Sequence, residues 1–284
     1  MFYYIFYILG KDYEDGFNCK DEEFLFDLDT KAVNIFQREM RKIFEWCGKP
    51  NKFLGFTHGT GNYRKTLDIT YKSKRPTKPE AIGRITKACE NRYKLIPVNN
   101  IEVDDACSIS LIHYNKIYED NIEYQPILVS ADKDLLTIPG HHLRPRKNGE
   151  LEYIFIDEVT GTYNLMYQMI VGDTADGVKG IEGLGEVAAN KILGKEWIEY
   201  KLTDDEYTED LYDEEGNCLH ISGESIYDEI KYEKSLQVLQ AYIKRYGEVE
   251  GCRQFSYNFI KLNMLRFPMY DFVIPELTNL VYAK

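Results

Sequence analysis

The stretch Pro126-Ile-Leu-Val-Ser-Ala-Asp-Lys-Asp134 decides the predicted fold. Its short apolar run is typical of a buried strand, and Asp132 and Asp134 come directly after the end of that run. Similar strands are expected at 53–56, 94–98 and 153–156, and helices at 31–47, 103–114 and 163–170. Alternating strands and helices predict an α/β fold with a mainly parallel sheet flanked by helices. Ligands bind beyond the carboxyl ends of such strands, so we expect the functional site there.

The pattern changes at residue 172. Beyond it only helices are expected: one at 186–193, opened by the glycine turn 180–185, and two more at 234–247 and 254–265. We therefore predict an α/β domain over 1–171 and a helical region over 172–284. A basic segment at about 58–92 lies in the first, and a solvated acidic insertion at about 203–233 in the second. Residues 140–142, Gly-His-His, are expected to form a loop without a ligand role.

Composition predicts a globular, intracellular protein. The chain has 284 residues, of which 44% are hydrophobic and 14% aromatic, enough to fill a core. Its six cysteines are scattered without the spacing of a zinc site, which favours free thiols in a reducing compartment. The apolar run at 1–9 is too short to cross a bilayer and is expected to be buried.

Charge is unevenly distributed along the chain. The formal net charge of −12 argues against a general binder of polyanions. However, residues 64–94 hold ten basic residues and three acidic ones, whereas residues 201–235 hold twelve acidic residues and three lysines. Because salt screens charges beyond about 8 Å, a local basic stripe can still bind phosphates.

Three short acidic clusters lie where apolar runs end. They consist of Glu102, Asp104 and Asp105; Asp132 and Asp134; and Asp173 and Asp176. Gathered carboxylates repel one another unless a cation neutralises them, and oxygen ligands suit Mg²⁺ or Mn²⁺. The clusters therefore predict a divalent-metal site. The alternative is that these acids only cap helix N-termini.

These motifs resemble the flap endonuclease and 5′→3′ exonuclease superfamily in its bacteriophage branch. The resemblance runs from about residue 53 to 193. It rests on the three acidic clusters, on the turn 180–185, and on Asn62-Tyr-Arg-Lys65 with Tyr71, Lys72 and Arg75, which are similar to the superfamily's arch. It implies a PIN-like nuclease core followed by a helix-three-turn-helix region that binds DNA.

The resemblance also implies a role for each matching residue. Asp104, Asp105 and Asp132, with Glu102, would serve one metal ion, and Asp134, Asp173 and Asp176 a second, both Mg²⁺ or Mn²⁺. Lys72 and Arg75 would approach the scissile phosphate, and Arg64, Lys65 and Tyr71 would contact DNA. Gly183 and Gly185 would bind duplex phosphates, with K⁺ as a further cofactor. The alternatives are an ordinary basic surface, a core tyrosine at Tyr71, and a plain helix-turn-helix corner.

The function implied is a Mg²⁺-dependent 5′ nuclease. Its substrates would be DNA with a 5′ end, a flap or a nick, and RNA primers in RNA–DNA hybrids. We expect a monomer without a membrane partner, in the cytoplasm of a bacterial host if it is a phage protein. Two alternatives are a catalytically impaired, structure-specific DNA-binding protein and a metal-dependent phosphatase acting on small phosphate esters.

Two features depart from the superfamily pattern. The chain lacks the first strand and its metal-binding aspartate, and Thr57-His58 stands where a second aspartate is expected. Three accounts are open: a true start upstream, a depleted first metal site, or binding without catalysis.

Overall fold

The computed structural model describes most of the chain in separate stretches. These are residue 9 and residues 22–48, 50, 52–75, 80–119, 121, 124–146, 148–194, 223–268, 273–274, 276 and 278–279. The apolar run at 1–8 and most of the predicted acidic insertion, residues 203–222, lie outside the described residues. The expectations for these two segments therefore stay predictions.

The chain divides into two compact units. The first comprises residues 1–63, 75–110 and 265–284, and the second residues 64–74 and 111–264. This division by contacts does not coincide with the boundary expected at residue 172, which stays a prediction. Each unit is described by itself below.

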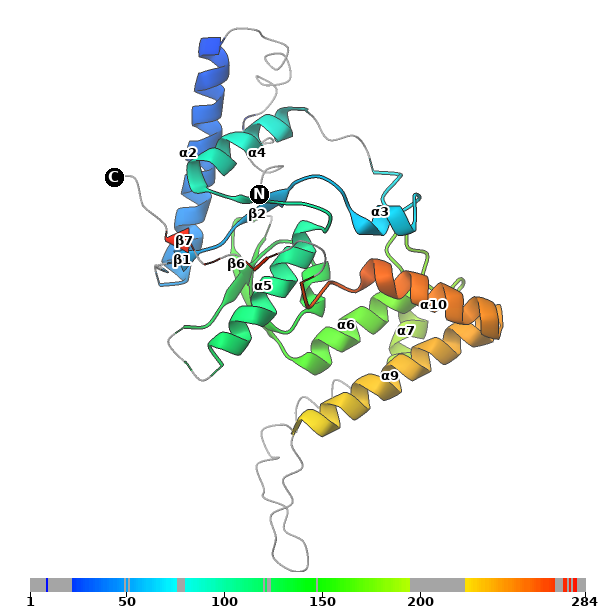
Figure 1. The fold of residues 1–284 in the computed structure, drawn as a ribbon. Coiled ribbons are helices and arrows are strands. Elements are labelled where there is room, and N and C mark those ends of the chain that lie inside the picture. The colour runs from blue at the N-terminus through cyan, green and yellow to red at the C-terminus, as the bar shows by residue number, and fades with distance from the viewer. Residues whose placement is uncertain are drawn as a thin grey trace, which may run out of the picture. The chain divides into compact units, whose positions relative to one another are not determined.

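The first unit combines helices with two small sheets. Its elements are α2 (Glu22–Trp46), β1 (Lys52–Phe53), β2 (Phe56–His58), α4 (Glu80–Tyr93), β3 (Ile96–Val98), the start of α5 (Val103–Ile117) and β7 (Thr278–Asn279). Strands β2 and β3 are parallel, with Thr57 opposite Pro97, and β1 and β7 are antiparallel. Figure 1 shows α2 beside α4.

Helix α2 carries the apolar stripe that the sequence predicts, over a longer span. Its buried side chains recur every three or four residues: Leu28, Ala32, Phe36, Met40, Ile43 and Phe44. Such spacing places them on one face of a helix. Arg84 of α4 makes a two-pronged ion pair with Asp29 of α2, at 2.9 and 2.7 Å. The two helices are thus joined by apolar packing and by charge.

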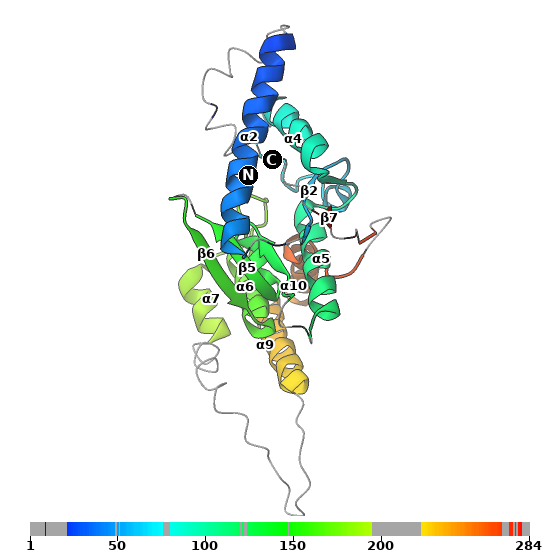
Figure 2. The same cartoon turned by 90° about the vertical axis from the view of Figure 1, so that its left-hand side faces the viewer.

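The second unit contains the three-stranded sheet β4-β5-β6. Its elements before residue 172 are α3 (Tyr63–Leu67), the end of α5, β4 (Ile127–Val129), the 3₁₀ turn η2 (Asp134–Thr137), β5 (Gly140–Pro145), β6 (Leu151–Ile156) and α6 (Glu158–Val171). β4 and β5 are parallel, and β5 and β6 are antiparallel. Figure 2 shows α6 beside β5 and β6.

The expected loop at 140–142 is wrong, because these residues begin β5. Sequence rules classified Gly-His-His after a proline as a loop, but each residue pairs with β6, His142 opposite Ile154. His142 is buried, and its Nε2 lies 2.8 Å from the carbonyl oxygen of Ile138. Tertiary pairing has overridden a weak local preference.

The helices after residue 172 share one apolar core with α6. In the described part of the chain they are α7 (Glu186–Leu193), α9 (Gly223–Tyr246) and α10 (Glu248–Leu262). The fully buried members of this core include Met169 and Ile170 of α6, Leu193 of α7, and Val238 and Tyr242 of α9. This packing fixes α6 and the segment that follows it.

The α/β class is confirmed. The described sheets are small: of their four strand pairs, β2–β3 and β4–β5 are parallel and the other two antiparallel. Among the described residues, no helix has the length and apolar character needed to cross a membrane.

Candidate functional site

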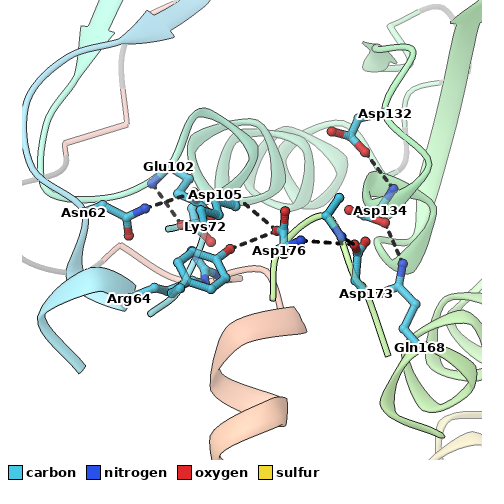
Figure 3. Close-up of polar contacts among 12 residues, drawn as sticks. Asn62, Arg64, Lys72, Glu102, Asp105, Asp132, Asp134, Gln168, Asp173 and Asp176 are labelled. Atoms are coloured by element: carbon cyan, nitrogen blue, oxygen red, sulfur yellow. Dashed lines mark hydrogen bonds and ion pairs between the residues drawn. The ribbon is translucent and has the colours of Figure 1, made fainter. Parts of the chain in front are cut away.

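The end of β4 places two acids of the second unit next to each other. Asp132 follows the strand, and its Oδ1 accepts a hydrogen bond from the backbone N–H of Asp134, at 3.0 Å. Asp134 begins the turn η2, and its Oδ1 accepts a hydrogen bond from Nε2 of Gln168 in α6, at 2.7 Å (Figure 3). The Asp134 carboxylate is therefore oriented by a side chain from another element.

The other two acids of this unit follow α6 in a tight turn. Gly172 ends α6 with φ +81°, where a Cβ would lie 2.6 Å from the backbone of Gly180, so only glycine fits. Oδ1 of Asp173 accepts hydrogen bonds from the backbone N–H groups of Ala175 and Asp176, at 2.8 and 3.2 Å. Asp173 and Asp176 are both buried, each 8% exposed.

Three acids of the second unit act electrostatically on the fourth, Asp134. Burial raises the pKa of Asp134 to about 6, and the nearby carboxylates of Asp132, Asp173 and Asp176 add to the rise against the opposing charge of Lys133. A raised carboxyl pKa means that the ionised form is disfavoured where it lies. A cation at this place would relieve that repulsion.

Lys72 already supplies part of the missing positive charge. Its Nζ lies 3.2 Å from Oδ2 of Asp176, and the same oxygen accepts a hydrogen bond from the hydroxyl of Tyr71, at 3.1 Å (Figure 3). Lys72 has a left-handed backbone, φ +55°, and its N–H bonds to the carbonyl of Asp176 at 3.2 Å. Two contacts therefore hold Lys72 to the third acidic motif.

The structure favours the core interpretation of Tyr71 over base stacking. The side chain is only 2% exposed, so its ring has no free face for a base. It serves the site indirectly, through its hydroxyl on Asp176 and through its ring, whose centre lies 4.9 Å from Nζ of Lys72.

The structure likewise gives Arg64 a structural place instead of a DNA contact. The residue is 1% exposed, and its guanidinium donates hydrogen bonds to the carbonyl oxygens of Ile260 and Asn263, at 3.2 and 2.9 Å. These carbonyls lie at the carboxyl end of α10, where the helix dipole favours a cation. The basic pattern of the sequence does not distinguish such a buried arginine from a surface one. Lys65 and Arg75 are exposed, and their roles stay predictions.

The glycine turn before α7 is open to solvent. Gly183 has φ +82°, and a Cβ at either Gly183 or Gly185 would meet nothing within 4 Å. Gly185 is the N-cap of α7 and provides no side-chain cap. Backbone N–H groups at such a helix start can bind a phosphate, so the predicted role of this turn stays a prediction.

The acids of the first unit start helix α5. Asp105 is fully buried, and its oxygens accept hydrogen bonds from the backbone N–H groups of Glu102 and Leu265, at 3.0 and 2.9 Å. Glu102 is 6% exposed and accepts a hydrogen bond from Asn62, at 3.0 Å (Figure 3), while Asp104 is half-buried. Asp105 therefore acts at least as a helix-start anchor, the alternative that sequence rules left open.

Thr57 occupies the position where the resemblance leads one to expect an aspartate. Its side chain is buried, and its hydroxyl donates a hydrogen bond to Glu90 at 2.5 Å. A neutral hydroxyl thus stands within β2.

The side-chain chemistry of the second unit's acids suits a hard divalent cation, but in this structure the side chains do not converge on one point. Within the described stretches, no group of three or more His, Cys, Asp or Glu side chains lies close enough to hold an ion. All four acids offer oxygen ligands, which Mg²⁺ and Mn²⁺ prefer, and the charges of the other three add to the burial that raises the pKa of Asp134.

Known proteins with similar sequences are nucleases. A 5′-3′ exonuclease of Mycoplasmopsis pulmonis is 26% identical over 199 residues, which cover 66% of this chain and 63% of that protein. A flap endonuclease Xni of Shewanella woodyi is 25% identical over 139 residues, 46% of this chain and 54% of its own. The resemblance to the flap endonuclease and 5′→3′ exonuclease superfamily is confirmed. The match spans less than two thirds of either relative of this superfamily, and no protein-family model matches the chain.

Solved structures of the superfamily were also found. A bacteriophage T5 D15 protein co-crystallised with metal ions covers 84% of this chain and 96% of its own, at 13% identity and a TM-score of 0.43. A T5 5′-exonuclease with bound zinc covers 88% and 96%, at 12% identity and a TM-score of 0.41.

Sequence reasoning missed the two amide side chains that hold acids in place. Asn62 was noted only as part of the arch, yet it bonds to Glu102. Gln168 was not singled out, yet it bonds to Asp134. No motif marks Gln168; the only signal was its place one helical turn before Gly172.

Proposed function

We propose that this chain is a metal-dependent 5′ nuclease, which hydrolyses phosphodiester bonds in 5′-ended or branched DNA. The observation that carries the proposal is the group of four acids in the second unit, at the end of β4 and after α6, in which the charges of the other three add to the burial that raises the pKa of Asp134. The names of the similar sequences, a 5′-3′ exonuclease and a flap endonuclease, support the choice of reaction.

The second unit would hold one of the two proposed ions through Asp134, Asp173 and Asp176. When bound, Mg²⁺ or Mn²⁺ activates a water molecule and stabilises the leaving oxygen of a phosphodiester. The protein's own part is to present charged oxygens. Asp173 is held by two backbone N–H groups, and Asp134 by the amide of Gln168.

The basic residues would act on the DNA. Lys72 and Arg75 would neutralise the phosphate that is cleaved, because cations aimed at a developing negative charge lower the barrier. In this structure Lys72 pairs with Asp176, so it would have to exchange this partner for the phosphate. Lys65 and the N–H groups near Gly183 and Gly185 would bind the phosphate backbone without reading the sequence.

The first unit would contribute Glu102, Asp104 and Asp105 to the other ion, and the share of Asp132 in it stays a prediction. Asp105 already accepts two backbone hydrogen bonds, and Thr57 brings no charge. We therefore propose that this ion is bound more weakly than the one in the second unit. Cleavage of RNA–DNA hybrids, K⁺ at the glycine turn and a monomeric state stay predictions.

A panel of labelled substrates tests this function. The protein is incubated with a 5′-flap duplex, a 3′-flap duplex and a mononucleotide phosphate ester, each with Mn²⁺ or with EDTA. We expect cleavage of the 5′ flap in Mn²⁺ only. Release of phosphate from the mononucleotide instead would favour the phosphatase alternative, and binding of the flap without any cleavage would refute the nuclease.

A further inference from the structure

Gln168 links two of the acidic motifs through one residue. Its side-chain Nε2 donates a hydrogen bond to Oδ1 of Asp134, at 2.7 Å. Its backbone carbonyl accepts a hydrogen bond from the N–H of Gly172, at 2.7 Å, directly before Asp173. The position of the Asp134 carboxylate is therefore coupled to the end of α6, from which the third acidic motif departs.

The negative charge of Asp134 determines which atom of the Gln168 amide faces it. An ionised Asp134 can only accept hydrogen bonds, so the NH₂ group of Gln168 must point toward it. The other amide atom, Oε1, is then turned away. It is buried, and among the described residues no group donates a hydrogen bond to it.

A buried acceptor without a donor is costly and rare in native proteins. Oε1 has almost no accessible surface, so water does not offset this cost. The amide therefore keeps an orientation that is unfavourable for Oε1 but directs Nε2 at the Asp134 carboxylate (Figure 3).

We propose that Gln168 is a positioning residue of the metal site: it aims the Asp134 carboxylate through the hydrogen bond from its Nε2. This inference rests on the proposed function, because it assumes that the acids of the second unit bind a cation. It adds a residue that no acidic or basic motif contains. Groups that orient a ligand in this way affect metal affinity by about 10- to 100-fold.

Asn164 provides a matched control on the same face of α6. It lies one turn before Gln168, and its Nδ2 donates a hydrogen bond to the carbonyl oxygen of Leu136 in η2, at 2.7 Å. Both amides thus join α6 to η2, but among the described contacts only that of Gln168 ends on a carboxylate. Replacing either one loosens the same junction.

The test compares Mn²⁺ binding by the wild type, Gln168→Leu and Asn164→Leu, using the full chain and isothermal titration calorimetry. We expect Gln168→Leu to weaken Mn²⁺ binding by about tenfold or more. Asn164→Leu should lower the melting temperature but change the Mn²⁺ affinity by less than about twofold, since it touches no ligand. Binding of a 5′-flap duplex in EDTA should be unchanged in both variants.

Two results would overturn the inference in distinguishable ways. If the wild type binds Mn²⁺ and Gln168→Leu binds it equally well, or if Asn164→Leu weakens it as much, Gln168 has only a structural role and the proposed function survives. If the wild type binds no Mn²⁺ at all, the proposed function and this inference fail together.

Discussion

The ammonium group of Lys72 lies 3.2 Å from a carboxylate oxygen of Asp176, and each side chain is only 11% exposed. Lys72 adopts a left-handed backbone, φ +55°, and its N–H also bonds to Asp176. The lysine proposed to act on the phosphate is therefore the counterion of an acid proposed to bind metal. Lys72 and the proposed metal ion would therefore compete for the same carboxylate.

Lys72→Met should separate these two roles. Without the ammonium group, Asp176 loses its ion pair with Lys72, so we expect Mn²⁺ to bind more tightly, by about fivefold, as for an ion pair of roughly 1 kcal/mol. Cleavage of a 5′ flap should nevertheless fall by about 100-fold, because a stabilising cation is lost. Calorimetry and a gel assay measure the two quantities.

Lys65→Met is the control for this change. Lys65 is exposed, and replacing it with Met removes the same formal charge as Lys72→Met. A general electrostatic effect would therefore change the Mn²⁺ affinity of both variants alike. An equal rise in Mn²⁺ affinity in both would contradict a specific competition at Asp176.

Arg64→Leu should destabilise the protein without a specific loss of DNA affinity. The change removes the buried guanidinium that donates to the carbonyl oxygens of Ile260 and Asn263, which costs about 2–4 kcal/mol of unfolding free energy. Lys65→Leu should cost less than about 0.5 kcal/mol, as for an exposed position. Urea unfolding gives these values. If Arg64→Leu unfolds like the wild type but binds DNA weakly, the buried assignment is wrong.

His142 should make the stability depend on pH. Burial lowers the pKa of His142 below its ordinary value of 6.5, against the opposing effect of its hydrogen bond to Ile138. The unfolded chain therefore takes up a proton at a higher pH than the folded one, and stability is lost as the pH falls below about 6.5. Chemical unfolding at pH 5 to 8 measures this.

His142→Gln is the comparison for that measurement, because glutamine keeps an N–H donor but does not titrate. The stability of the wild type relative to His142→Gln should fall as the pH is lowered through this range. A difference that stays constant from pH 8 to 5 would refute the assigned protonation.

Much of the fold could be predicted because its pattern is local. The stripe on α2, the strand before Asp132 and the helix after the glycine turn each follow from periodicity and turn residues. The strand at His141 and His142 could not, because it depends on pairing with β6, which is distant in the sequence. The contacts of polar side chains at the site are hard to predict for the same reason.

Some residues of the candidate site could likewise be located from the sequence, and others could not. Acids at strand and helix ends could be located, since their type and spacing are visible in the sequence. The burial of Arg64 and Tyr71 could not, because a basic or aromatic residue has the same letter on the surface and in the core. The contact of Gln168 with Asp134 arises only when α6 packs against η2.

The most direct test of the account removes two carboxylates together. Wild type and the double variant Asp173→Asn with Asp176→Asn are given an end-labelled 5′-flap duplex over a range of Mn²⁺ concentrations, and binding of the same duplex is measured in EDTA. We expect the wild type to cleave only with Mn²⁺, and the double variant to bind the duplex as tightly without cleaving it. Cleavage by the double variant at the wild-type rate would contradict the assignment of these acids to the metal.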